Sequence, residues 1–145
     1  MITPQQVLLV QSSFAQVAPM AEKVAELFYA RLFEIDPEVR ALFKGDMKRQ
    51  GTLLMGMLTA GVRGLSKPEA LVPVLKQLGG RHAGYGVEPQ HYTTVGIALL
   101  WTLEHGLGEA FTVEVREAWA AAYTLIATTM QQGAAQAMPM EPMAA

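Results

Sequence analysis

The sequence contains no cysteine, few charged residues and no long uninterrupted run of apolar residues. Without cysteine, the 145-residue chain has no disulfide, no thiol nucleophile, no thiolate metal site and no thioether-linked cofactor. Any metal ion must therefore be held by histidine, carboxylate or methionine side chains. The hydrophobic share of 51% is enough for the core of one compact domain.

The charge balance favours no strongly charged partner. The chain has 11 Lys and Arg against 13 Asp and Glu, a net charge of −2, so we expect neither nucleic acid nor an anionic membrane as a partner. The longest uncharged stretch, 118–140, is interrupted by threonine, glutamine and glycine, so we do not expect it to span a membrane. The N-terminus carries no basic leader, and we therefore expect a cytoplasmic protein.

Apolar residues recur at spacings of three and four, and no segment alternates apolar and polar residues as a β-strand does. Local signals mark helix ends: Thr3 before Pro4, with Gln6 following, is a capping box, and Asp36 before Pro37 opens a short helix. Ser66 with Glu69 three residues later is a second capping box, and Thr112 is expected to cap the last expected helix. The pattern predicts an all-α protein. The expected helices cover about 4–18, 20–35, 37–43, 47–64, 66–84, 89–107 and 112–132.

The last residues, 133–145, are small, contain proline and lack large aliphatic side chains. Such a segment buries too little apolar surface to fix its own conformation. We therefore expect one domain over residues 1–132 and a disordered C-terminal tail over 133–145.

His82 is predicted to point into the interior, because it continues the apolar stripe of the helix expected over 66–84, which consists of Leu71, Val74, Leu75 and Leu78. A buried imidazole needs a partner for each nitrogen. Two interpretations stay open: a core histidine bonded to a backbone carbonyl, or an axial metal ligand oriented through its second nitrogen. His91 and His105 lie near helix ends and are expected at the surface, which leaves too few ligands for a catalytic zinc site. Haem iron, by contrast, is held by a single histidine.

Tyr29 and Gln50 are the second pair of interest. Tyr29 follows Phe28 on an otherwise apolar stretch, and Gln50 lies four residues before Leu54, hence on the same helical face. Either residue fits the boundary of a core, with one end in water. Both are also donors of the kind that stabilise a polar diatomic ligand at haem iron.

Several residues together resemble a globin. The matching segments are Phe28-Tyr29, Asp36-Pro37 leading to Leu42-Phe43, Gln50 with Leu54, Leu78-Gly79-Gly80-Arg81-His82, Tyr85-Gly86-Val87 and Tyr92. Their order and separations are similar to those of bacterial single-domain haemoglobins and of the globin domain of flavohaemoglobins, over about residues 4–132. The resemblance implies a three-over-three helical sandwich around a haem pocket.

The resemblance also implies a role for each matched residue. His82 corresponds to the proximal ligand of the iron of haem b, and Tyr29 and Gln50 correspond to the distal pair that hydrogen-bonds the gaseous ligand. Gly51 and Ala25 correspond to small residues at a close helix crossing. The other positions expected to contact haem are Phe28, Phe43, Leu54, Leu78, Tyr85, Tyr92 and Val95.

The function implied by the resemblance is reversible binding of dioxygen, CO and NO. It extends to NO dioxygenase-type detoxification when a separate reductase supplies electrons. The glutamate that makes the proximal histidine of flavohaemoglobins more basic falls at about Ala134 here, so peroxidase-like activation should be weaker. The alternatives are a haem-based gas sensor read by a partner protein, and a helical interaction protein without haem.

Overall fold

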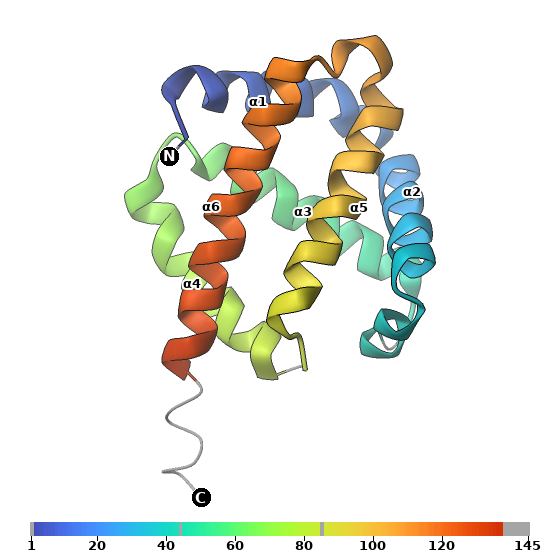
Figure 1. The fold of residues 1–145 in the computed structure, drawn as a ribbon, viewed down its shortest axis with the longest axis vertical. Helices are drawn as coiled ribbons and strands as arrows, with labels where there is room; N and C mark the ends of the chain where they lie inside the picture. The colour runs from blue at the N-terminus through green and yellow to red at the C-terminus, as the bar shows by residue number, and fades with distance from the viewer. Residues whose placement is uncertain (1, 44, 85, 138–145) are drawn as a thin grey trace, which may run out of the picture.

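The computed structural model describes residues 2–43, 45–84 and 86–137, and this part of the chain is helical with no β-strand (Figure 1). The all-α prediction is therefore confirmed, and every expected helix is present, although the short third one is a 3-10 helix. The elements in chain order are α1 (Pro4–Val17), η1 (Ala18–Met20), α2 (Ala21–Ile35), η2 (Pro37–Leu42), α3 (Met47–Gly64), α4 (Pro68–Gly84), α5 (Pro89–Leu107), η3 (Gly108–Ala110) and α6 (Val113–Ala137).

Predicted side-chain caps start two of the helices. The Thr3 hydroxyl accepts a hydrogen bond from the Gln6 amide at 3.1 Å, and the Gln6 side chain accepts one from the Thr3 amide at 3.0 Å. At the start of α6, the Thr112 hydroxyl accepts from the Val115 amide at 3.2 Å. These bonds satisfy amide groups that the first turn of a helix leaves without a partner.

Two expectations for α4 are wrong. The helix begins at Pro68 and not at Ser66, because the Ser66 hydroxyl accepts a hydrogen bond from the Gln11 side chain of α1 at 2.8 Å instead of capping α4. Val74 is 56% exposed, although it was expected on the apolar stripe. The buried residues of α4 are Leu71, Leu75 and Gly79, which are spaced four apart. Val74 is not one of this set.

The helices form the expected three-over-three arrangement, with α1, α3 and α4 in one layer and α2, α5 and α6 in the other (Figure 1). Helix α6 packs against both α1 and α4, and α2 packs against α3 and α5. Each helix therefore buries its apolar face against the opposite layer or against a neighbour.

A buried hydrogen bond joins the first and last helices. The Trp119 indole nitrogen donates to the Ser13 hydroxyl at 2.8 Å, across 106 residues of sequence. The Ser13 hydroxyl donates in turn to the Leu9 carbonyl at 2.7 Å, and the Phe14 ring lies 6.2 Å from the Trp119 ring. Because these polar groups all have partners, the core contains them without a large desolvation cost.

Helices α2 and α3 cross closely at two small residues. A Cβ atom built on Gly51 would lie 3.0 Å from the Cβ atom of Ala25, and both residues are buried. The close crossing expected for this pair is therefore confirmed. It brings the first turn of α3, which carries Gln50, against α2.

Helix α6 continues past residue 132, where the domain was expected to end, and reaches Ala137. Gly133, the first residue of the expected tail, is buried against the backbone of α4, which explains why the helix continues there. The rest of the expected tail, 138–145, lies outside the described residues. Within the described ranges, no helix is both long and apolar enough to cross a membrane.

Candidate functional site

Tyr29 and Gln50 are brought together where α2 crosses α3. The Tyr29 hydroxyl donates to the main-chain carbonyl of Gln50 at 3.5 Å; Tyr29 is buried and Gln50 half-buried. Burial raises the pKa of Tyr29 above its ordinary value, and its interaction with Gln50 offsets part of that rise. The hydroxyl therefore keeps its proton at neutral pH and is available as a donor.

Aromatic rings surround Tyr29. The Phe28 ring lies 5.1 Å from it at 75°, and the Phe43 ring lies 5.3 Å from it at 74°. Phe33, which the sequence analysis did not select, stacks on Tyr29 at 5.9 Å and meets Phe43 at 5.7 Å. Its position four residues after Tyr29 on the same helix is the signal that could have identified it. Edge-to-face packing of this kind holds the Tyr29 ring in one orientation.

Four apolar residues expected to contact haem are only half-buried. They lie on four different elements or connections, although each packs against the buried core on one side. Apolar side chains of a closed core are buried more completely than this. The half-buried set consists of Phe43, Leu54, Leu78 and Val95, whereas the expected residues Phe28 and Tyr92 are buried.

His82 lies near the end of α4 and is half-buried. Its Nδ1 atom lies 2.9 Å from the carbonyl oxygen of Leu78, one turn earlier. Burial lowers the pKa of His82, the bond to Leu78 opposes this, and the charge of Arg81 adds to the lowering. The neutral imidazole is therefore favoured. With its proton on Nδ1 toward the carbonyl, it carries its lone pair on Nε2, the form that ligates a metal.

The buried hydroxyl of Tyr92 has no hydrogen-bond partner among the described residues. The main-chain carbonyl of Tyr92 accepts a hydrogen bond from the Tyr123 hydroxyl at 2.6 Å, so α6 fixes the position of this turn of α5. Burial raises the pKa of Tyr92. A buried donor without a hydrogen-bond partner lowers the stability of the chain by itself. Such a donor fits a position beside a bound group that is not part of the chain. The other expected tyrosine, Tyr85, lies outside the described residues.

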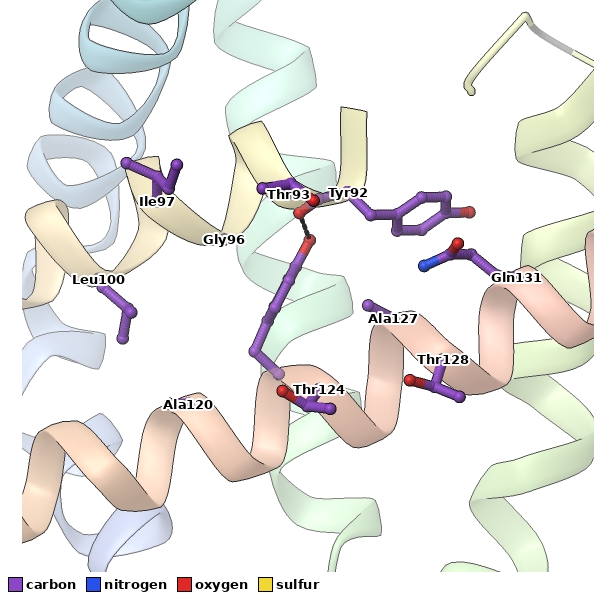
Figure 2. Close-up of a pocket in the computed structure, with 11 residues that line it drawn as sticks. Tyr92, Thr93, Gly96, Ile97, Leu100, Ala120, Thr124, Ala127, Thr128 and Gln131 are labelled. Atoms are coloured by element: carbon purple, nitrogen blue, oxygen red, sulfur yellow. Dashed lines mark hydrogen bonds between the residues drawn. The ribbon is translucent and has the colours of Figure 1, made fainter. Parts of the chain in front are cut away.

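Tyr92 also borders a groove between α5 and α6 (Figure 2). The groove has a volume of about 350 Å³, and neither His82 nor the Tyr29–Gln50 pair lines it. Among the described residues, the groove therefore shares only Tyr92 with the site assembled above. Its walls combine apolar residues such as Ile97 and Leu100 with threonine hydroxyls from both helices.

The other two histidines lie near the two ends of α5. His91 Nδ1 accepts a hydrogen bond from the Glu88 amide at 2.8 Å, which caps α5. His105 is exposed as expected, whereas His91 is half-buried. The His105 ring stacks on Trp101 at 3.9 Å, and its Nδ1 atom lies 2.9 Å from the Trp101 carbonyl. Both rings thus have local structural partners.

Comparison with known proteins matches the chain to the Globin family model over residues 26–130. The chain belongs to the globin family. Its curated relatives include a flavohemoprotein of Xylella fastidiosa, 34% identical over 132 residues that cover 89% of this chain and 33% of that protein. A neuroglobin of Tetraodon nigroviridis is 32% identical over 121 residues, which cover 74% of this chain and 76% of the neuroglobin.

A solved structure is similar to this globin over nearly the whole of both chains. It is an engineered carbene transferase, a candidate nitric oxide dioxygenase from Rhodothermus marinus, with a TM-score of 0.87, 27% sequence identity, and coverage of 98% of this chain and 99% of that one. The expected globin fold is thereby confirmed. A flavohemoprotein of Bacillus subtilis is 30% identical over 130 residues, 88% of this chain and 33% of its own. The globin spans about a third of the length of the flavohemoproteins it matches.

Proposed function

We propose that this globin binds haem b non-covalently through His82 and reversibly binds dioxygen, CO and NO. The observation that carries the proposal is the His82–Leu78 hydrogen bond, which orients the ring so that Nδ1 faces the carbonyl and the lone pair of the neutral imidazole is on Nε2. When bound, haem supplies an iron that takes up diatomic ligands and exchanges single electrons. Membership of the globin family and the names of the relatives support haem as the cofactor.

The half-buried apolar set fits the faces of a porphyrin. Phe43, Leu54, Leu78 and Val95 come from separate parts of the chain and keep part of their surface accessible in the chain alone. Covering that surface with a large flat apolar group would remove it from water, a favourable change that stabilises both partners. These side chains would hold the group by contact and exclude water from it.

Tyr29 and Gln50 would supply the polar contacts to the gaseous ligand. The Tyr29 hydroxyl keeps its proton because burial raises its pKa, and the Gln50 amide has no proton to lose in the physiological range. Both are donors, and a donor favours a ligand that carries partial negative charge. This pair should therefore favour dioxygen over CO.

A catalytic role in NO detoxification is the second part of the proposal. The conversion NO + O2 + e⁻ → NO3⁻ consumes one electron for each nitrate formed, so sustained turnover needs a reductase as electron donor. Two observations support this role: the flavohemoprotein relatives, and the solved neighbour that is named as a candidate nitric oxide dioxygenase.

Visible absorption spectra of the ferric, dithionite-reduced and CO-bound forms test the proposal. Wild-type protein expressed with a haem supply should give a haem spectrum with a reversible CO complex, and His82→Ala should lose or weaken both. His105→Ala is the matched control, because its ring is exposed and stacks on Trp101. A folded, colourless wild type that takes up no added haem would refute the proposal. Loss of NO and formation of nitrate with an added reductase then test the catalytic part.

A further inference from the structure

Helices α4 and α6 touch through their backbones at two glycines. They run side by side in Figure 1 and share the most extensive helix contact of the described chain. A Cβ atom built on Gly79 would overlap the carbonyl oxygen of Met130, and one built on Gly133 would overlap the carbonyl oxygen of Lys76. The two contacts are reciprocal, because each helix offers one glycine to a carbonyl of the other. Along an antiparallel pair they lie one turn apart.

These two positions exclude any side chain. The atoms that a Cβ would meet belong to the backbone, which cannot rotate away as a flexible side chain can. Gly84, at the end of the same helix, has no atom of the described residues within 4 Å of its Cβ position. Glycine lowers the stability of a helix interior relative to alanine. Its presence at 79 and 133 is explained by the close approach of the two backbones.

The contact lies one turn before His82. Leu78, whose carbonyl lies 2.9 Å from His82 Nδ1, is the direct neighbour of Gly79. Whatever sets the position of this turn relative to α6 also sets the position and direction of the imidazole, because the helix and the hydrogen bond connect them rigidly.

We propose that Gly79 and Gly133 are positioning residues for the proximal ligand. By locking α4 onto α6, they hold His82 in the place where it meets the iron, before haem binds. This inference rests on the proposed role of His82. An alanine at either position must push α4 away from α6, so both substitutions should displace the imidazole in the same way.

The test compares Gly79→Ala and Gly133→Ala with the control Gly84→Ala, all as haem-loaded full-length protein. Resonance Raman spectra of the ferrous form report the stretching band of the bond between iron and His82. We expect the band to move in the same direction in the first two variants and to stay unchanged in the control. The CO association rate should change by roughly tenfold or more in those two variants, since ångström-scale misplacement of a functional group has effects of this size. Unmoved bands, or a shift in Gly79→Ala alone, would overturn the inference.

If the variants fail to fold, a measurement on the wild type tests the inference instead. Hydrogen exchange is followed at the amides of residues 76–82 in the full chain, with haem and after haem extraction. Slow exchange in both states is expected if α6 holds α4; fast exchange after extraction would show that haem holds it, and would overturn the inference. A wild type that never binds haem refutes the proposed function, whereas a haem-binding wild type with unmoved variants refutes only this inference.

Discussion

The Tyr29 hydroxyl lies 3.5 Å from the main-chain carbonyl oxygen of Gln50. The distance is set by the crossing of α2 and α3, where Gly51 lets the two backbones approach beside Ala25. At this length the bond is weak. The hydroxyl is therefore able to exchange it for a stronger bond to a ligand at little cost in free energy.

Substitution of Tyr29 by phenylalanine should weaken the binding of dioxygen more than that of CO. The change removes one hydrogen-bond donor and keeps the ring among Phe28, Phe33 and Phe43. A net loss of about 1 kcal/mol corresponds to a dioxygen dissociation rate raised by about three- to tenfold. Laser photolysis and stopped-flow mixing measure both rates in the same preparation. Equal changes for both gases would contradict the role of Tyr29 as a donor.

Ligand kinetics of the wild type should depend little on pH between about 5 and 8. Gln50 does not titrate, and burial keeps the pKa of Tyr29 above its ordinary value near 10. Replacement by histidine, Gln50→His, places a titratable group at the same position and should create a step near pH 6 to 7, about the ordinary pKa of histidine. Dissociation rates recorded across this range compare the two proteins. A clear pH step in the wild type would argue against the distal assignment.

The protein should lose stability above about pH 10. Burial raises the pKa of Tyr29, Tyr92 and Tyr123 in the folded chain. Above the ordinary pKa of about 10, the unfolded chain releases these protons first and binds fewer than the folded chain, so the free energy of unfolding falls as pH rises. Urea unfolding between about pH 8 and 11 measures the slope. In Tyr92→Phe the slope should be smaller, and an unchanged slope would mean that Tyr92 does not contribute.

Removal of the Tyr92 hydroxyl should stabilise the haem-free protein. This buried group has no partner among the described residues, so Tyr92→Phe relieves a desolvation cost and should raise the free energy of unfolding by about 1 kcal/mol. The contrasting variant is Tyr123→Phe, which removes the donor to the Tyr92 carbonyl. This change should lower the free energy of unfolding by about the same amount. Chemical denaturation of both haem-free variants measures the difference. Destabilisation by Tyr92→Phe would show that its hydroxyl has a partner in solution.

Much of the fold could be predicted because its signals are local. The Thr3 capping box and the Asp36-Pro37 pair mark helix ends through groups only a few residues apart. The neighbourhood of Tyr29 and Gln50 was expected from the resemblance, which already contains the crossing of α2 and α3. Periodicity within the helix itself predicted that His82 faces the interior, and the structure shows this residue half-buried.

The features that were missed depend on contacts between distant segments. Gly133 was assigned to a disordered tail because its neighbours are small, yet it lies against the Lys76 backbone and α6 continues past it. Phe33 lies four residues after Tyr29 on the same helix, and this local signal was passed over, whereas its contact with Phe43, which lies on another element, has no such signal. No period of three or four residues encodes how closely two backbones approach or which rings meet across a bend.

The hydrogen bond between Ser13 and Trp119 has a consequence for synthesis of the chain. Its two partners are 106 residues apart, and at roughly 5 to 20 residues per second a ribosome needs roughly 5 to 20 seconds to make that length. During this interval α1 has left the ribosome without the helix that covers its buried face. The growing chain therefore exposes apolar surface until α6 emerges, and chaperones that bind nascent chains have that time in which to act on α1.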